Sequence, residues 1–217
     1  MNIEIELKYQ ILEESKVHDF VKNLHLLGVK RVVDCYLDTE DASLFKKGIY
    51  IRVRDNKKID IKFNRACLND PNLELQSYCE EHSFNVPFTN ESIIEINSLH
   101  HSLDLASISH HDLDNYRYAN NLIEHRIVDK IRTSYLVDDF TIVLDDVVGL
   151  GKFLEIEFMA FNLENFDFIK AEMQKLLQGL HLKPLLTGYD ALILRQQNFK
   201  QYIRGRFALK EDFESAI

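Results

Sequence analysis

The sequence of 217 residues lacks the features that mark membrane, secreted and disulfide-rich proteins. It contains no apolar run long enough to span a bilayer, and its first residues lack the basic and hydrophobic regions of a signal peptide. Its three cysteines are odd in number and have no C-x-x-C spacing, so they indicate neither a disulfide framework nor a zinc site. These absences predict a cytoplasmic protein with reduced thiols.

The sequence also lacks an excess of basic residues. Lys and Arg number 26 against 35 Asp and Glu, which gives a formal net charge of −9. A broad nucleic-acid-binding surface draws on surplus positive charge, so we expect an anionic ligand to bind only in a local basic pocket. The length and the ordinary apolar fraction of 46% fit one globular domain with a sizeable core.

Strict alternation of apolar and charged residues is the dominant pattern in the chain. In residues 3–8 it predicts a strand with Glu4, Glu6 and Lys8 on one face. Residues 49–54 and 59–63 alternate in the same way, and the polar run between them predicts a hairpin turn. Further strands are predicted at residues 29–38, 122–137, 141–144 and 153–161.

Helical spacing of apolar residues predicts a smaller set of helices. They are expected at residues 13–28, 166–177 and 189–203, with a short link at 44–48. Residues 65–118 are irregular, with a strand at 78–86 and weak helices at 91–99 and 103–111. We interpret this stretch as an insertion within a single domain of residues 1–205, followed by a loosely held tail at 206–217.

The charges on the alternating faces are sorted by sign. The acids are Glu4, Glu6, Asp145, Glu155 and Glu157, and the bases are Arg52, Arg54, Lys62, Lys130 and Arg132. If the helices cover the apolar face, the charges point inward and the antiparallel sheet closes into a barrel with a polar lumen. The alternative is an open sheet whose charged face meets water, with bases and acids paired across strands.

The composition of the charged face favours the closed arrangement, because few neutral residues separate the like charges. Concentrated like charges repel one another unless a counter-ion is present. The carboxylates stand without His or Cys, which favours a hard cation such as Mg²⁺ or Mn²⁺, and the bases suit a phosphate chain. Phosphoryl transfer requires this combination of a metal and charge-neutralising Arg and Lys residues.

Taken together, the motifs resemble the CYTH superfamily, the triphosphate tunnel metalloenzymes that include class IV adenylate cyclases, thiamine triphosphatases and inorganic triphosphatases. The signature Glu4-x-Glu6-x-Lys8 is weak alone, but the others occur in the family's order and cover nearly the whole chain apart from the insertion. They are Tyr36-Leu37-Asp38-Thr39, Arg52-x-Arg54 with Lys62, Val128-x-Lys130-x-Arg132-x-x-Tyr135, and Leu144-Asp145-Asp146-Val147 leading through Gly149-Leu150-Gly151 to Phe153-Leu154-Glu155-Ile156-Glu157.

The resemblance implies an α+β fold, a closed tunnel of eight antiparallel strands covered by peripheral helices, and it implies roles for individual residues. Glu4 and Glu6 would bind Mg²⁺ or Mn²⁺, with Asp145, Glu155 and Glu157 completing the metal site. The phosphate-binding residues would be Lys8, Arg52, Arg54, Lys62, Lys130 and Arg132, and the residues assigned to catalysis are Glu4, Glu6, Lys8 and Lys62. Arg126 shares the parity of these bases, but the resemblance assigns it no role.

The sequence departs from the family pattern in its C-terminal segment. Many members carry Lys or Arg just before a Tyr, whereas this chain has Leu186-Thr187-Gly188-Tyr189. One phosphate contact is therefore missing or replaced. Lys183 and Arg195 are the replacements that the sequence offers, although the surface of a helix is the plainer role for each.

The leading function implied by the resemblance is metal-dependent hydrolysis of a triphosphate. The substrate would be inorganic triphosphate, ATP or thiamine triphosphate, and the protein would act as a monomer or homodimer, without nucleic acid or membrane. The alternative is an adenylate cyclase that converts ATP to cyclic AMP and pyrophosphate. A third reading is a non-catalytic triphosphate binder, because the C-terminal base is missing.

Overall fold

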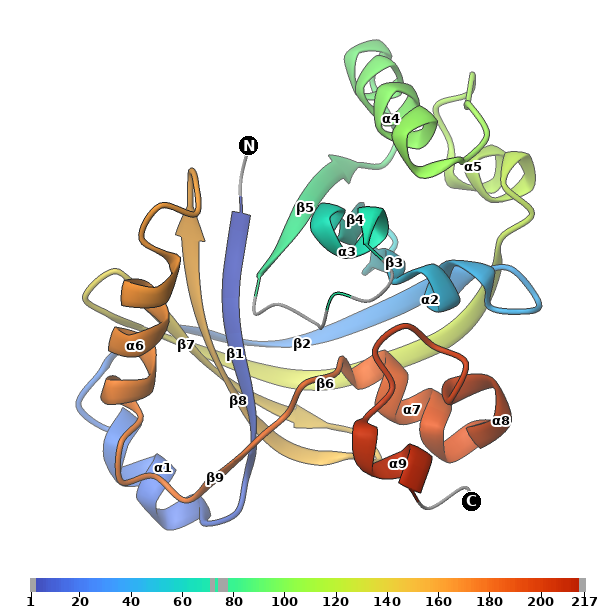
Figure 1. Ribbon diagram of the computed structural model, residues 1–217. Helices are drawn as coiled ribbons and strands as arrows, with labels where there is room; N and C mark the ends of the chain where they lie inside the picture. Colours follow the sequence, from blue (N-terminus) through green and yellow to red (C-terminus); the bar gives the residue numbers. More distant parts are fainter. Residues whose placement is uncertain (1–2, 71–72, 74–77, 215–217) are drawn as a thin grey trace.

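The computed structural model describes residues 3–70, 73 and 78–214 (Figure 1). Within these ranges, every helix is too short or too polar to cross a bilayer. Along the chain the elements are β1 (Ile3–Ile11), α1 (Glu14–Val21), β2 (His25–Asp38), α2 (Ser43–Lys47), β3 (Ile49–Arg54), β4 (Lys58–Phe63), α3 (Arg65–Asn69), β5 (Tyr78–Asn85), α4 (Asn90–Leu103), α5 (Leu113–Ala119), β6 (Ile123–Val137), β7 (Phe140–Val147), β8 (Gly151–Ala160), α6 (Phe166–Leu176), β9 (Leu182–Pro184), α7 (Tyr189–Gln197), α8 (Phe199–Tyr202) and α9 (Lys210–Glu214).

The strands in the described part of the chain form one antiparallel sheet in the order β5-β4-β3-β2-β6-β7-β8-β1-β9. Strand β5 also pairs with β1, from Ile3 opposite Glu80 to Ile5 opposite Tyr78, and this pairing joins eight strands into a ring. The short β9 pairs with the far end of β1, opposite Tyr9 to Ile11. The predicted ring of eight antiparallel strands with covering helices is therefore confirmed.

The hairpin of β3 and β4 shows how alternation sets the two faces of the ring. Asp55 and Asn56 form its turn with φ angles of 50° and 55°, the left-handed geometry that matches the twist of paired strands. Ile51 lies opposite Ile61 and Arg52 opposite Asp60. Because side chains alternate along a strand, the isoleucines point out of the ring and the charged pair points into it.

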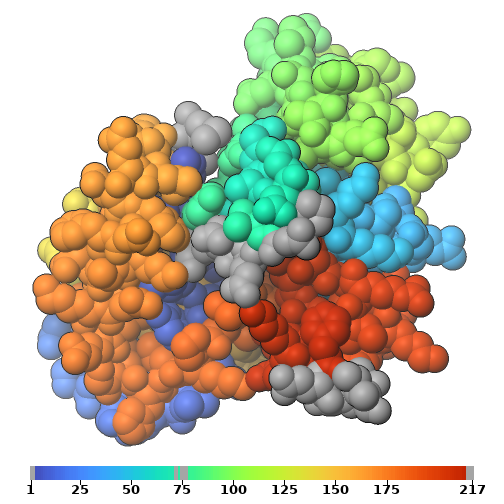
Figure 2. Space-filling model, in the orientation of Figure 1, coloured from blue at the N-terminus to red at the C-terminus, as the bar shows by residue number. Residues whose placement is uncertain are grey.

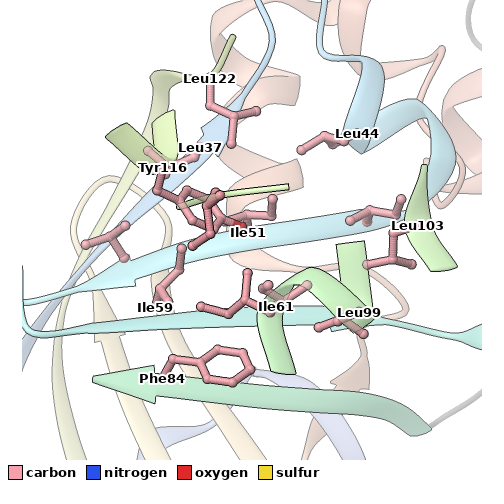
Figure 3. Packing of buried hydrophobic residues seen from close by; sticks show 14 of the residues in the cluster. Leu37, Leu44, Ile51, Ile59, Ile61, Phe84, Leu99, Leu103, Tyr116 and Leu122 are labelled. Carbon is pink, nitrogen blue, oxygen red and sulfur yellow. The ribbon is translucent and has the colours of Figure 1, made fainter. Parts of the chain in front are cut away.

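Two apolar clusters lie outside the ring, beneath the helices. Helices α4 and α5 cover β3 and β4, where Ile51, Ile59 and Ile61 pack with Tyr116 and other fully buried side chains (Figure 3). Helices α1 and α6 lie against β1 on the other side (Figure 1), and their cluster includes Met173. Burial of these side chains removes apolar surface from water and leaves the charged face as the lining of the ring.

One predicted helix is shorter in the structure, and another is absent from the described residues. The helix expected at residues 13–28 ends at Val21, because β2 begins at His25 and pairs with β6 from that residue onward. The long pairing with β6 provides hydrogen-bond partners for the backbone of β2. This gain outweighs the helical spacing of the leucines in this stretch. The helix expected at 103–111 is absent from the described residues, since α4 ends at Leu103 before Asp104 in the left-handed conformation, and Asp112 caps the later α5.

The structure also shows which elements form in the irregular stretch at residues 65–118, in the final helix and in the expected tail. Strand β5 of the 65–118 stretch is part of the ring, while residues 71–72 and 74–77 lie outside the described residues. The final helix divides at Asn198 into α7 and α8. Residues of the expected tail form α9, whose Asp212 is 3% exposed and accepts a hydrogen bond of 2.9 Å from Tyr202; residues 215–217 lie outside the described ranges.

Candidate active site

A cavity of about 510 Å³ lies inside the ring. Side chains from β1, β3, β4, β5, β6 and β8 line it, together with residues of the segment 184–190 and of helix α6. Almost all of the predicted site residues are in this lining: Glu4, Glu6, Lys8, Arg52, Arg54, Lys62, Lys130, Arg132, Glu155 and Glu157. The inward-pointing charges therefore share one enclosed space.

Three carboxylates form an acid cluster on one wall of the cavity. Oxygen atoms of Glu4, Glu6 and Glu157 all lie within 4.8 Å of one another, because β1 and β8 place Glu6 directly opposite Glu157. Burial, followed by the charges of Glu155 and Glu4, raises the pKa of Glu157 to about 8. Three oxygen donors at this spacing suit a hard divalent cation, and such a cation would relieve the repulsion between them.

The other two predicted metal ligands lie in a second, charge-balanced group. Asp145 accepts hydrogen bonds from Lys130 at 2.9 Å and from Arg132 at 2.8 and 2.6 Å. Arg132 also donates to Glu155 at 2.5 Å. The structure thus brings three of the five predicted ligands together and places Asp145 and Glu155 among bases that neutralise them.

Lys8 lies between the acid cluster and this second group. Its ammonium nitrogen is 2.9 Å from Glu6 and 2.8 Å from Glu155, and it lies 4.3 Å above the centre of the Tyr189 ring. Burial disfavours the charged form, but the charges of Glu155 and Glu6 outweigh it and raise the pKa of Lys8. The Lys130 ammonium lies over the same ring at 4.8 Å, so Tyr189 positions both lysines.

A third group on the opposite wall contains carboxylates that the sequence analysis missed. Arg52 donates to Asp60 at 3.1 and 2.7 Å and to Glu81 at 3.3 Å. Arg54 donates to Asp34 at 2.7 and 3.0 Å. The signal was available for Asp60, which has the same parity as Lys62 in an alternating strand.

Lys62 connects this third group to the acid cluster. Its ammonium lies 2.5 Å from Glu4 and 3.1 Å from Glu81. The bases of the cavity therefore pair with more carboxylates than the five acids identified from the sequence. Each is held by at least one carboxylate from a neighbouring strand.

The C-terminal segment without a base also lies at this cavity. Leu186, Thr187 and Tyr189 line it, whereas Lys183 and Arg195 do not. Lys183 lies 3.8 Å from Glu211, and Arg195 bonds to Asp212. Neither replacement offered by the sequence is thus in the cavity wall.

Arg126 is buried beside helix α7 and is not part of the cavity lining. Its guanidinium lies 3.6 Å from Asp38 and 3.5 Å from Asp190, over the ring of Phe45 at 5.1 Å. These contacts join β6 to β2 and α7. Arg126 therefore connects structural elements, a role that its parity in the sequence did not indicate.

Comparison with known proteins gives the same assignment as the motifs. The CYTH domain model matches residues 2–187. A protein of Methanocaldococcus jannaschii described as a candidate adenylate cyclase is 23% identical over 182 residues, which cover 83% of this chain and 90% of that protein.

Three solved structures are similar in fold. A candidate adenylate cyclase from Vibrio parahaemolyticus has a TM-score of 0.56 at 18% identity and covers 86% of this chain and 95% of its own. A Pyrococcus horikoshii protein has a TM-score of 0.57 at 20% identity, covering 89% and 98%. A Hippeastrum protein, described as an adenylyl cyclase candidate with a dominant triphosphatase activity, has a TM-score of 0.57 at 15% identity, covering 90% and 96%. Since the family model extends over nearly the whole sequence, the chain belongs to the CYTH domain family.

Proposed function

We propose that the protein is a divalent-metal-dependent triphosphatase. The observation that carries the proposal is the division of one cavity into an acid cluster of Glu4, Glu6 and Glu157 and an adjoining set of lysines and arginines. An acid cluster suits a cation and a basic wall suits a phosphate chain. An anionic substrate that carries its own cation matches both parts at once.

The donor set of the acid cluster fits Mg²⁺ or Mn²⁺, because all three ligands are carboxylate oxygens. When bound, the cation would neutralise phosphate charge and orient the chain for in-line displacement. Glu4, Glu6 and Glu157 would hold it. Asp145 and Glu155 would act on the phosphate-binding bases instead, since Lys130, Arg132 and Lys8 already engage them.

Substrate binding would exchange carboxylate partners for phosphate oxygens. Arg132, Arg52 and Lys62 each have more than one carboxylate partner, so each can turn toward a phosphate while one ion pair persists. A buried base that lost every partner would be costly, whereas a substituted partner keeps it satisfied. The ion pairs of the free cavity thus preserve the geometry that the phosphate chain requires.

Hydrolysis adds water to the terminal phosphorus, breaks the bond to the bridging oxygen and releases orthophosphate. A carboxylate of the acid cluster would accept a proton from the attacking water, and Lys8 and Lys62 would stabilise the negative charge on the phosphate oxygens. Both lysines carry raised pKa values, because the surrounding acids outweigh burial, and they stay charged through neutral pH. They therefore serve as charge stabilisers.

The second candidate is an adenylate cyclase, which the descriptions of the Methanocaldococcus and Vibrio proteins favour. In that reaction the ribose 3′-hydroxyl attacks the α-phosphorus and pyrophosphate leaves. The Hippeastrum protein, whose description reports a dominant triphosphatase activity, favours hydrolysis. The same charged cavity suits both reactions, because both begin with a bound triphosphate and a metal.

Product analysis distinguishes the two candidates. The pure protein is incubated with ATP, thiamine triphosphate or inorganic triphosphate, each with Mg²⁺ or Mn²⁺, and the products are separated. Orthophosphate release supports the triphosphatase, and the fastest substrate identifies its class. Cyclic AMP with pyrophosphate replaces the proposal by the cyclase. If triphosphate binds and no product forms, the protein is a binder.

A further inference from the structure

Helix α6 covers the outside of the ring, yet it contributes two side chains to the cavity. Lys170 and Gln174 both line it, and they lie one helical turn apart on the same face of the helix. Met173, on another face, is fully buried against β1. Figure 2 shows atoms of the N-terminal strand in blue between the orange α6 region and the red C-terminal region. One face of α6 thus anchors the helix and another reaches the cavity.

Lys170 differs from the other bases of the cavity in its partners. Lys8, Arg52, Arg54, Lys58, Lys62, Lys130 and Arg132 each lie within 4.0 Å of a carboxylate. Among the described residues, no carboxylate forms an ion pair with Lys170. Its ammonium lies 5.8 Å from the centre of the Phe166 ring, and Phe166 packs edge-on against Tyr78 of the cavity wall at 5.3 Å.

This difference affects what each base can offer a ligand. A phosphate oxygen that approaches one of the paired bases must compete with a carboxylate, whereas Lys170 presents its ammonium without such competition in the described structure. Its ammonium lies near the face of the Phe166 ring, a cation–π contact that leaves the N–H donors available to a ligand. Lys170 is half-buried, so its charge is screened less than that of a fully exposed lysine.

Lys170 also lines the same cavity as the C-terminal segment that lacks a base. Leu186 and Thr187, which stand where many family members have a base, line the same cavity as Lys170. The backbone of this segment is fixed to β1, because the Leu185 amide donates to the Lys8 carbonyl at 2.8 Å. Helix α6 also lies against β1 (Figure 1). Both therefore flank the same strand beside the cavity.

We propose that Lys170 binds the phosphate chain of the substrate and takes the place of the base that the C-terminal segment lacks. The proposal rests on the triphosphate-binding function of the cavity. Lys170 contacts phosphate rather than an organic group, so its contribution is shared by inorganic and organic triphosphates alike. Hydrogen bonds to charged groups contribute enough that loss of the ammonium weakens binding about tenfold.

The test measures binding apart from turnover. Inorganic triphosphate is titrated into the protein by calorimetry in the presence of a chelator, and the same titration is repeated with ATP. Lys170→Ala is expected to raise the dissociation constant of both ligands about tenfold, and Lys170→Arg to restore most of the affinity because it keeps the charge. The matched control is Lys175→Ala, since Lys175 lies on the same helix with 72% of its side chain exposed and is not part of the cavity lining.

Each outcome separates this inference from the proposed function. Unchanged affinity in Lys170→Ala overturns the role of Lys170 and leaves the triphosphatase proposal intact. A loss for ATP alone also overturns it, because the contact is then to the nucleoside. An equal loss in Lys175→Ala shows a general charge effect and overturns it as well. If the wild-type protein binds triphosphate through Lys170 but hydrolyses none with Mg²⁺ or Mn²⁺, the inference stands and the triphosphatase proposal fails. A wild type that binds no triphosphate either in chelator or with Mg²⁺ or Mn²⁺ removes both.

Discussion

The two faces of the β3–β4 hairpin are both buried, but they are buried against different chemistry. The outer face packs Ile51, Ile59 and Ile61 under α4 and α5, each with no exposed surface. The inner face buries Arg52 and Asp60, 8% and 0% exposed, in a network of ion pairs. The same alternation thus builds an apolar core and a charged cavity on one pair of strands.

The difference teaches which face carries stability and which carries chemistry. Apolar burial stabilises the fold directly, while a buried ion pair gains little net free energy because desolvation offsets the attraction. Apolar burial on the outer face therefore offsets the desolvation free energy of the charged residues on the inner face. Changes to the outer face should alter mainly the free energy of unfolding, whereas changes to the inner face should also alter ligand binding and turnover.

The largest expected effect is on the outer face. Ile61→Ala should lower the free energy of unfolding by about 4 kcal/mol, because it leaves a cavity beneath α4 in a fully packed cluster. Denaturant unfolding measures this change. The control Ile127→Ala removes the same atoms from a side chain that is 56% exposed and should cost far less. Equal losses in the two variants would contradict the assignment of the outer face as the stabilising core.

Arg52→Ala tests how the inner face responds when a buried carboxylate, Asp60, loses one of its basic partners. It leaves Asp60 with Lys58 as its remaining basic partner, so the free energy of unfolding should fall by about 3 kcal/mol, and triphosphate affinity should fall as well. Arg31→Ala is the matched control, because Arg31 pairs with Asp129 at 2.6 Å but is 66% exposed. An Arg52 variant with wild-type affinity would remove this side chain from the phosphate-binding set.

Glu157→Gln separates chemistry from stability. Metal-dependent turnover should fall about a hundredfold, equivalent to about 2.7 kcal/mol in the activation barrier, since the acid cluster loses one charged donor. Stability should hold or increase, because one of the crowded negative charges is removed. Steady-state kinetics and unfolding in chelator measure both. Glu164→Gln, an exposed glutamate outside the cavity lining, is the control, and full activity of Glu157→Gln would refute the acid cluster as the metal site.

The last expected effect is a change of stability with pH in metal-free protein. Folding raises the pKa of Glu157 to about 8, so the folded state favours its protonated form. That contribution is fully present below the ordinary glutamate pKa and is lost as the pH rises through about 8. Unfolding in chelator between about pH 5 and pH 9 should show wild type losing stability relative to Glu157→Gln. Parallel curves for the two proteins would contradict the shift.

The sequence specified the faces of the ring better than the pairings within it. Alternation placed Glu4, Arg52 and Lys62 inside the ring, because parity along a strand determines the face. It did not separate Asp145 and Glu155, which accept hydrogen bonds from bases, from Glu157, which lies 3.6 Å from Arg132 and belongs to the acid cluster. That difference depends on the register between β6, β7 and β8. Register reflects long-range pairing and cannot be read from one strand alone.

Other features depended on contacts between distant segments. The start of β2 at His25 follows from its long pairing with β6, which a local pattern does not contain. Lys170 looked like an ordinary residue of an amphipathic helix, and only the packing of α6 beside β1 brings it to the cavity. Asp34, which holds Arg54, stands in a run of mixed polarity where no alternation marked it.

The pairing of β1 with β5, which closes the ring, shares a residue with the acid cluster. In the described ranges this clasp joins Ile3–Ile5 to Tyr78–Glu80, far less than the ladder that joins β2 to β6 from His25 to Asp38. Glu4 is in the clasp, opposite Cys79, and also in the acid cluster. A ligand that neutralises the cluster should therefore also stabilise this short pairing of β1 with β5. Hydrogen exchange of the β5 amides should slow when the ligand binds.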